Sequence, residues 1–389
     1  MAVTTVGVIR ERHPGEKRVA ITPETAARLI AKDIAVVVES NAGAASRHTD
    51  QEYRDAGADV AALDEVVSSA DILCCVNPSR LDGVRAGQIL IGIFEPLYRT
   101  ELMRDLQTAN ATVLSLDLLP RKLSRAQTMD ALSSQANAAG YKAVLVAADA
   151  YGRYFPMLTT AAGTSQPATV LVLGTGVAGL SAIGTARRLG AVVTAYDVRP
   201  EAKGEVESLG ARFLELKSAI AGSGEGGYAR QLNQEERDTQ QRELAEAIGK
   251  FDIVITTAKV PGRKPPLLVT DEAIARMRAG SVVVDMAAGE LGGNVATVKP
   301  DATMETDNGV TVIGAGNLPS ELGPSASAAY ARNMSAVIAH LVTESGPVID
   351  IDDEITGALT VTHEGRPVNA AMTEILSETS KPVGDTDGA

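Results

Sequence analysis

Aromatic residues are scarce in this sequence, which has no tryptophan and only 3% Phe, Trp and Tyr together. Hydrophobic residues nevertheless make up 45% of its 389 positions, so the core has to be built from Ala, Val, Leu and Ile. Aliphatic residues of this kind are typical of the buried strands in layered α/β proteins. The composition therefore favours a layered α/β fold.

Cysteine is also nearly absent. The two cysteines, Cys74 and Cys75, are adjacent inside the apolar run DILCCV, where we expect them to be small buried hydrophobic residues. Two neighbouring cysteines cannot supply a disulfide framework, so the pattern predicts a reducing compartment.

Basic residues are fewer than acidic ones: the chain has 36 Lys and Arg and 49 Asp and Glu, which gives a net charge of −13. Binding to the phosphates of nucleic acids needs clustered Lys and Arg, so this balance argues against a nucleic-acid partner. An acidic surface instead suits a soluble cytoplasmic protein. We expect no metal site.

A continuous hydrophobic run of membrane-spanning length is lacking too. No charged residue lies between Arg153 and Arg187, but Pro156 and Pro167 interrupt that stretch. A spanning helix needs about 20 continuous apolar residues. The N-terminal MAVTTVGVIRER leads straight into a strand and shows no signal-peptide pattern. We therefore expect a soluble protein that reaches a membrane only through partners.

The length of the chain suggests two domains. Short apolar strands alternate with helical stretches along both portions, which predicts two Rossmann-like, doubly wound parallel sheets of the α/β class. The expected strands are residues 4–10, 34–40, 70–76, 88–94 and 111–119 in the first portion, 169–174, 191–198, 211–216, 252–258, 281–287 and 310–315 in the second, and a strand pair that takes up the whole segment 348–368.

Two long helices, expected at residues 124–150 and 324–342, would join the domains. We place an N-terminal Rossmann-like domain in residues 1–126, completed by the C-terminal segment 327–389. A nucleotide-binding Rossmann domain would then occupy residues 127–326.

A glycine pattern follows one expected strand and opens a helix in VLVLGTGVAGL. In this context Gly174 permits a tight turn, Gly176 lets the backbone approach a pyrophosphate, and Gly179 lets the helix pack on the strand. The N–H groups of Val177 and Ala178 would face the phosphates at the positive end of the helix. The segment therefore predicts a dinucleotide site.

The acidic residue Asp197 ends the next strand, 18 positions after Gly179. Its carboxylate would accept hydrogen bonds from a ribose diol and would repel a 2′-phosphate. This residue predicts NAD(H) rather than NADP(H), and the nearby Arg199 is the feature that argues the other way.

A second unusual stretch is SRAQTMDALSSQ. Gln127, Asp130, Ser133 and Ser134 recur every three or four residues, so they would share one face of the expected helix. Apolar residues normally hold such a face, and polar ones suggest a binding role. The alternative is a capping box between Ser124 and Gln127, which leaves Ser133 unexplained.

The segment AGSGEGGYA has four glycines in six residues, followed by Tyr228. A long, polar, glycine-rich loop inside a compact domain is often a lid over a binding site. An ordinary surface insertion is the alternative.

The opening segment GVIRERHPGEKRVAITPETAARL and the arrangement of the chain resemble the alanine dehydrogenase and pyridine nucleotide transhydrogenase superfamily over about residues 4–375. An alanine dehydrogenase needs a cation for its substrate carboxylate and acid/base groups at the carbonyl. The resemblance places the cation at Arg18. Its lysine and histidine positions fall on Val76 and Glu95, so those two groups are missing.

A transhydrogenase needs no general acid, because hydride passes directly between two nicotinamides and the protein only has to hold the rings. The resemblance implies that Gln127, Asp130 and Ser133 act at the nicotinamide of NAD(H), with Arg125 and Ala126 among the cofactor-binding residues.

The family also places an arginine five residues before Gln127, a position that Lys122 occupies here with Arg121 beside it, so either residue could make this contact. The remaining cofactor-binding residues that the resemblance implies are Val198 and Arg199 after Asp197, Gly227 and Tyr228 in a nucleotide-closing loop, and Gln240 and Ala258 near the adenosine end.

The resemblance thus implies the NAD(H)-binding component of a proton-translocating transhydrogenase, which passes hydride from NADH to NADP⁺ on a partner component. With one G-x-G-x-x-G unit and no expected membrane helix, partners would supply the NADP(H) site and the membrane channel. A homodimer on the cytoplasmic face of the cell membrane is implied as well. The alternatives are an alanine dehydrogenase-like amino-acid dehydrogenase and a non-catalytic NAD(H) sensor that uses Tyr228 as a switch.

Overall fold

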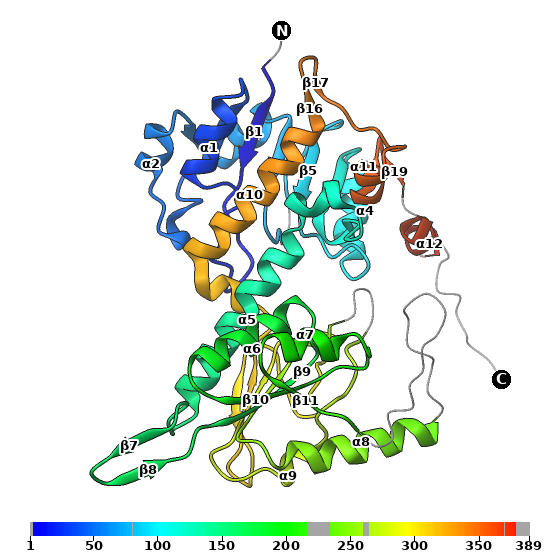
Figure 1. Ribbon diagram of the computed structural model, residues 1–389. Coiled ribbons are helices and arrows are strands. Elements are labelled where there is room, and N and C mark those ends of the chain that lie inside the picture. Colours follow the sequence, from blue (N-terminus) through cyan, green and yellow to red (C-terminus); the bar gives the residue numbers. More distant parts are fainter. Residues whose placement is uncertain (1–2, 80, 217–233, 260–263, 369, 379–389) are drawn as a thin grey trace, which may run out of the picture. The chain divides into compact units, whose positions relative to one another are not determined.

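The computed structural model describes residues 3–79, 81–216, 234–259, 264–368 and 370–378 (Figure 1). Contacts divide the chain into two compact units. The first unit combines Met1–Gln135 with Leu322–Ala389, and the second unit is Ala136–Glu321. The junctions expected from the sequence were at residues 126/127 and 326/327.

The first unit is built on an eight-stranded sheet in the order β19-β18-β6-β5-β4-β1-β2-β3. The six strands from β6 to β3 run parallel, and β18 joins β6 antiparallel. The strands are β1 (Thr5–Val8), β2 (Ala35–Glu39), β3 (Asp59–Ala61), β4 (Ile72–Cys74), β5 (Ile89–Gly92), β6 (Thr112–Ser115), β18 (Thr360–His363) and β19 (Arg366–Pro367).

Helices cover this sheet. Those of the first unit are α1 (Pro23–Ile30), α2 (Asp50–Asp55), α3 (Leu63–Ser69), α4 (Thr100–Thr108), α10 (Gly323–Leu341), α11 (Glu354–Leu359) and α12 (Ala370–Glu378), with 3₁₀ turns η1 (Ala44–Ser46), η2 (Leu116–Leu118) and η3 (Ser124–Met129). Local signals start two of them, since Thr22 caps α1 ahead of a proline and Thr49 forms a capping box on α2.

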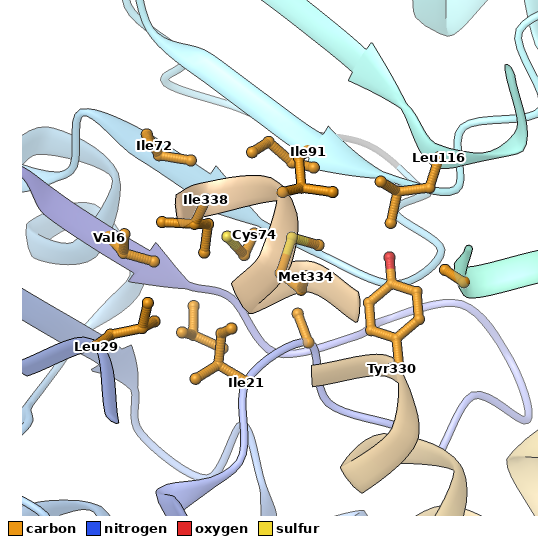
Figure 2. Close-up of a cluster of buried hydrophobic side chains, with 14 of the residues drawn as sticks. Val6, Ile21, Leu29, Ile72, Cys74, Ile91, Leu116, Tyr330, Met334 and Ile338 are labelled. Atoms are coloured by element: carbon orange, nitrogen blue, oxygen red, sulfur yellow. The ribbon is translucent and has the colours of Figure 1, made fainter. Parts of the chain in front are cut away.

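The core of the first unit brings distant parts of the chain together. Figure 2 shows Met334 and Ile338 of α10 beside Cys74 of β4, in one cluster of buried side chains. Cys75 belongs to the cluster on the other face of the sheet, because successive side chains of a strand point to opposite faces. Both thiols are buried, and burial raises the pKa of each. The prediction of two buried, unbridged cysteines is confirmed.

The second unit is built on a seven-stranded sheet in the order β11-β10-β9-β12-β13-β15-β14. All neighbouring strands are parallel except β14, which joins β15 antiparallel. The strands are β9 (Thr169–Leu173), β10 (Val192–Tyr196), β11 (Arg212–Phe213), β12 (Ile253–Thr256), β13 (Val282–Asp285), β14 (Thr303–Glu305) and β15 (Thr311–Gly314). These parallel-dominated sheets confirm the predicted α/β class.

The helices of the second unit are α6 (Val177–Arg188), α7 (Ala202–Ser208), α8 (Gln234–Ile248) and α9 (Asp271–Ala275), with the 3₁₀ turn η4 (Leu318–Leu322) at its end, and α5 (Ala131–Ala150) crosses the division between the units. Apolar clusters cover both faces of the sheet. No helix within the described residues has the length and apolar character that crossing a bilayer requires.

Two hairpins were not predicted. The hairpin of β7 (Leu158–Thr160) and β8 (Gly163–Ser165) extends away from the sheet (Figure 1), and a smaller one joins β16 (Val342–Thr343) to β17 (Gly346–Pro347). The uncharged stretch after Arg153 therefore supplies this first hairpin and then β9.

Two sequence predictions of secondary structure were wrong in part. The segment 348–368 forms only the short β18–β19 pair, because helix α11 precedes it; the side chain of Asp353 accepts hydrogen bonds from the N–H groups of Ile355 and Thr356 and so starts that helix. The expected helix from Ser124 is interrupted as well: η3 ends at Met129, and Asp130 has a non-helical ψ of 81° before α5 begins.

Candidate nucleotide-binding site

The carboxyl edge of the second unit's sheet has the layout of a ligand site. From the central strand β9 the chain runs outward through β10 and β11, then returns to place β12 on the other side of β9. Ligands of open α/β sheets bind beside the carboxyl ends of the strands at such a switch point. The residues that follow β9, β10 and β12, among them Gly174, Asp197 and Ala258, therefore meet at the expected crevice.

The three glycines at this edge serve different ends. Gly174 has φ +96°, and a Cβ there would lie 2.6 Å from the Thr257 hydroxyl. A Cβ on Gly179 would lie 2.0 Å from the Gly174 carbonyl oxygen. Around Gly176, by contrast, a Cβ would meet no atom within 4 Å, and its φ of −68° suits any residue. The fold requires Gly174 and Gly179, whereas Gly176 leaves open space.

Helix α6 begins at this open space. Its N-cap is Gly176, which offers no side-chain bond to the N–H groups of the first turn. Val177, at the start of the helix, is 39% exposed. Backbone N–H groups at the positive end of a helix attract an anion, so the residues predicted for the pyrophosphate lie where one could bind.

Asp197 directly follows β10 and accepts hydrogen bonds from two residues. Its Oδ2 accepts from the Thr175 N–H at 2.8 Å and from the Thr175 hydroxyl at 2.9 Å, and its Oδ1 accepts from the Arg199 N–H at 2.9 Å. Burial alone would raise the pKa of Asp197, but the bonds from Arg199 and Thr175 outweigh it and hold the pKa below its usual range. The carboxylate is therefore ionised at neutral pH.

Arg199 also contacts this carboxylate through its side chain. Its Nε lies 3.1 Å from Asp197 Oδ1, and one terminal nitrogen lies 3.3 Å from the Thr175 hydroxyl. Val198, between the two charged residues, is 59% exposed. A ribose diol that binds Asp197 would thus share the carboxylate with a guanidinium.

The other residues predicted near the adenosine end lie at the same edge. Gln240 of α8 donates to the hydroxyl of Tyr196, the residue before Asp197, at 2.7 Å. Ala258 exchanges two hydrogen bonds with the buried Asn294, whose side-chain oxygen accepts from the Ala258 N–H at 3.0 Å. Gly227 and Tyr228 lie outside the described residues.

Sequence reasoning missed Asn294 and Asp285. The amide of Asn294 also donates to the Pro266 carbonyl at 2.8 Å, while the buried Asp285 at the end of β13 accepts from Thr256 and from the Val295 N–H. Burial raises the pKa of Asp285 despite these bonds. In the sequence Asp285 ends an apolar run and Asn294 follows a pair of glycines, and these positions were the available signals.

In the first unit, the residues predicted for the nicotinamide lie on η3 and at the start of α5. Asp130 caps α5, because its Oδ1 accepts from the Ser133 N–H at 2.9 Å and its Oδ2 from the Ser133 hydroxyl at 2.6 Å. The structure thus brings Asp130 and Ser133 together. Gln127 is exposed on η3 and does not share a helix face with them, contrary to the sequence prediction.

The capping alternative for this stretch was wrong as well. The N-cap of η3 is Leu123, which makes no side-chain cap bond, so Ser124 and Gln127 form no capping box. Capping explains Asp130 and Ser133 instead and leaves the exposed amide of Gln127 unexplained. A binding role for Gln127 therefore stays a prediction.

The neighbours of Gln127 differ in exposure. Arg121 and Lys122 are both exposed, so exposure does not choose between them. Ala126 is 1% exposed and belongs to the unit's core, which leaves only its backbone for a ligand. Arg125 points its guanidinium at the carboxylates of Asp353 and Glu354, at 2.8 and 3.4 Å.

The positions where an alanine dehydrogenase would need its substrate-binding cation and its acid/base residues hold Arg18, Val76 and Glu95. Arg18 is buried, and its Nε and one terminal nitrogen contact the two carboxylate oxygens of Glu16 at 2.7 and 2.6 Å. Its other terminal nitrogen donates to Gln135 at 2.9 Å. Val76 is fully buried, and Glu95 follows β5 with φ +47°. The Arg18 guanidinium is thus already neutralised by Glu16.

Glu11 occupies the equivalent edge of the first sheet, where β1 and β4 adjoin. Its carboxylate accepts the N–H groups of Val76 at 2.5 Å and Asn77 at 3.0 Å. Together with Glu16 and Arg18 it lines a cavity of about 210 Å³. Burial raises the pKa of Glu11 to about 7, against the lowering effect of the two N–H groups.

We expect Glu11→Gln to remove a pH dependence of stability. A carboxyl whose pKa rises from 4.5 to about 7 on folding stabilises the fold below pH 4.5, and that contribution is lost as the pH rises through 7. Across this window Glu11 should cost the wild type up to about 3 kcal/mol of unfolding free energy, an upper bound because Glu11 is partly exposed, and the variant should lack this part of the loss. Denaturant unfolding at several pH values measures this. Glu24→Gln, at an exposed site, should keep the wild-type slope, whereas parallel curves for wild type and Glu11→Gln would contradict the prediction.

Comparisons with known proteins identify the family of the chain. Residues 7–139 match the sequence model described as alanine dehydrogenase/PNT, N-terminal domain, and residues 143–370 match its C-terminal domain. The chain is 43% identical over 371 residues to an NAD(P) transhydrogenase subunit alpha of Cereibacter sphaeroides, covering 92% of this chain and 70% of that protein.

Two further proteins match over nearly their full length. The first part of an NAD(P) transhydrogenase subunit alpha of Rickettsia prowazekii is 39% identical over 374 residues, which cover 94% of this chain and 96% of that one. The crystal structure of a transhydrogenase from Sinorhizobium meliloti is similar with a TM-score of 0.84 at 41% identity, covering 94% of this chain and all of that one.

Proposed function

The chain belongs to the alanine dehydrogenase/PNT family, and from this membership we propose that it is the NAD(H)-binding component of a proton-translocating NAD(P) transhydrogenase. The names of its relatives support an oxidoreductase of this class, because they are transhydrogenase alpha subunits at 39% and 43% identity. The finer assignment, NADH on this chain and NADP⁺ on a partner, rests on the site residues.

One observation carries the nucleotide assignment. Gly176 is a glycine at a position where the fold would accept a side chain, and the open space beside it adjoins the uncapped start of α6. A glycine of this kind is explained by a ligand that approaches the backbone, and a pyrophosphate is the group that a helix N-terminus favours. Asp197, ionised and one strand away, would accept the hydroxyls of the adenosine ribose.

The proposed reaction moves one hydride. C4 of NADH gives up a hydrogen with its two electrons, and C4 of NADP⁺ accepts them, so NADH is oxidised to NAD⁺ while NADP⁺ is reduced to NADPH. No proton leaves or arrives at either carbon, so no general acid or base is required. The protein contributes by orienting the ring, a role we assign to Gln127 and to the Asp130–Ser133 pair, with Arg121 or Lys122 as a nearby cation.

The partners are part of the same proposal. The names of the relatives describe an alpha subunit or a piece of one, which implies enzymes of several subunits and supports an assembly for this chain too. We infer that partner subunits carry the NADP(H) site and the membrane channel. This chain would act as a homodimer on the cytoplasmic face of the membrane and would reach the membrane only through those partners.

An alanine dehydrogenase-like activity is the second candidate in this family, and the local geometry speaks against it. The Arg18 guanidinium that would hold a substrate carboxylate is bonded to Glu16 and Gln135. Val76 and Glu95 stand where the family resemblance puts a lysine and a histidine. Val76 has no titratable group, and Glu95 is a carboxylic acid in place of an imidazole. Neither residue supplies the acid/base chemistry of the lysine and the histidine.

The deciding experiment measures hydride transfer from NADH to an NADP⁺ analogue whose reduced form absorbs at a distinct wavelength. The chain is mixed with the NADP(H)-binding component of a transhydrogenase, and each component alone is the control. We expect transfer only in the mixture. NADH oxidation by pyruvate and ammonia, with no transfer in the mixture, would replace the proposal with a dehydrogenase. NADH binding with neither reaction would instead make the chain an NAD(H) sensor.

We expect Asp197→Ala to weaken NADH binding about 10- to 100-fold, because a ribose hydroxyl loses a charged acceptor that is worth about 1.5–3 kcal/mol. NADPH should bind Asp197→Ala more tightly than it binds the wild type, since Arg199 is released from Asp197 and can contact a 2′-phosphate. Calorimetric titration with both nucleotides measures the change. In Asp197→Ala/Arg199→Met the gain for NADPH should disappear. An unchanged preference in both variants would place the ribose elsewhere.

A further inference from the structure

The segment η3 presents three distinct faces, because a 3₁₀-helix has three residues per turn. Ala126 and Met129 form one face and are buried in the core of the first unit, at 1% and 6% exposure. Arg125 and Thr128 form the second face. Ser124 and Gln127 form the third, and both are exposed.

The conformation of η3 is only weakly stabilised by its own hydrogen bonds and caps. The segment is six residues long, whereas 3₁₀ runs beyond three or four residues are uncommon because their hydrogen-bond geometry is strained. No side chain caps its first turn. Ala126, Met129 and the preceding Leu123 hold one face of the segment against the core, so rotation about the axis of the segment is limited from that one face only. The direction of Gln127 depends on this rotation.

The Arg125 side chain and the Thr128 backbone make a further restraint with the C-terminal part of the same unit. The Arg125 guanidinium lies 2.8 Å from Asp353 Oδ1 and 3.4 Å from a Glu354 oxygen. The Thr128 carbonyl accepts from the side-chain amide of Asn333, on α10, at 2.8 Å. The Arg125 side chain and the Thr128 backbone therefore tie the segment to two further parts of the unit, the start of α11 and helix α10, which restrains its orientation.

Asp353 is itself held rigidly. Its Oδ2 accepts the N–H groups of Ile355 at 3.0 Å and Thr356 at 2.9 Å, which caps α11, and His340 approaches the same oxygen at 3.2 Å. The Thr356 N–H and the Arg125 guanidinium outweigh the effect of burial and hold the pKa of Asp353 well below its usual range. A fixed, charged oxygen is therefore available to Arg125.

We propose that Arg125 and Asp353 are positioning residues that set the orientation of Gln127 through η3. Because the pair is on the surface, it adds little to stability, and its effect lies in geometry. The inference rests on the proposed function in one respect, namely that Gln127 orients the nicotinamide. It also assigns the side chain of Arg125 to Asp353 rather than to the nucleotide.

Two variants of the full chain separate this role from folding. Asp353→Asn keeps a good helix cap and removes the charge that holds Arg125, and Arg125→Met keeps the aliphatic stem. Each should slow hydride transfer to the NADP⁺ analogue about tenfold, in line with a small misplacement of a reacting ring, and should leave the Kd for NADH within about twofold. The double variant should be no slower than the single ones, because both act through one contact.

Hydrogen exchange supplies a readout that does not depend on activity. In both variants the amides of residues 124–130 should exchange several-fold faster than in the wild type, while those of β9 and β10 stay unchanged. Arg28→Met is the matched control, since Arg28 forms an exposed ion pair with Glu24 at 2.5 Å in the same unit and should change neither rate nor exchange.

The outcomes separate the inference from the proposed function. If the wild-type mixture transfers no hydride, the proposed function fails, and the exchange of residues 124–130 still decides whether the pair holds η3. Wild-type exchange and wild-type rate in both variants would overturn the inference. A raised Kd in Arg125→Met with no effect in Asp353→Asn would also overturn it, because Arg125 would then contact the nucleotide directly.

Discussion

Replacing Gly176 with alanine is expected to weaken NADH binding about 10- to 100-fold without destabilising the protein. A methyl group there meets no protein atom within 4 Å, so it would project into the space that we propose for the pyrophosphate. Steric overlap with a closely packed group costs about 1–3 kcal/mol. The free energy of unfolding should change little, because the gain of about 0.4–1 kcal/mol from restricting the unfolded chain is offset by the weaker N-cap that alanine makes in place of glycine.

Two other glycines of the second unit make this result specific. Gly179→Ala should destabilise the protein, because its Cβ would lie 2.0 Å from the Gly174 carbonyl oxygen and the backbone would have to move. Gly204→Ala, in α7 with no atom within 4 Å, should raise stability and leave NADH binding unchanged. Thermal unfolding and titration with NADH measure all three. Wild-type affinity in Gly176→Ala would place the pyrophosphate away from α6.

The second unit was largely predictable because its signals are local. The turn after β9 requires a positive φ at Gly174 and a close approach at Gly179, and both requirements are visible as glycines in the sequence. The apolar runs that became β9, β12 and β13 are buried on both faces, so a continuous hydrophobic stretch sufficed to identify them. The class of fold follows from such elements.

The first unit contains what the sequence could not reveal. The polar spacing from Gln127 to Ser134 fits one helix, yet the chain forms a 3₁₀ turn that ends at Met129, and Asp130 then caps a new helix. Whether Asp130 continues a helix or caps one depends on core residues far away in the chain. Tertiary packing decided between two local structures that the sequence allows almost equally.

The same limit applies to charged residues. Nothing in the sequence shows that Arg125 meets Asp353, 228 residues away, or that Arg18 is bonded to Gln135 across 117 residues. Family resemblance supplied Arg18 as a substrate cation and Arg125 as a cofactor contact, but the structure gives both guanidinium groups partners inside the first unit. Long-range partners determine which charges remain available for a ligand, and sequence patterns report only the presence of the charge.

Replacing Gln127 with asparagine is expected to slow hydride transfer about 10- to 100-fold while the Kd for NADH stays within about threefold. The substitution keeps the amide and withdraws it by one methylene, and a displacement of about 1 Å at a reacting centre costs up to about 100-fold in rate. Stability should not change, because Gln127 is exposed and lies on the face of η3 that points away from the core. Single-turnover transfer to the NADP⁺ analogue gives the rate, and titration with NADH gives the affinity.

Ser124→Ala is the matched control, because Ser124 shares the exposed face of η3 with Gln127 and should keep the wild-type rate. The comparison separates orientation from simple binding, since a group that contacts NADH equally in the ground and transition states changes affinity without changing the single-turnover rate. Equal losses of affinity and of overall efficiency in Gln127→Asn would therefore mean that this amide binds the nucleotide without orienting the ring. A lowered melting temperature would mean that Gln127 stabilises η3. The slower transfer would then follow from a change in η3 rather than from a direct role of the amide.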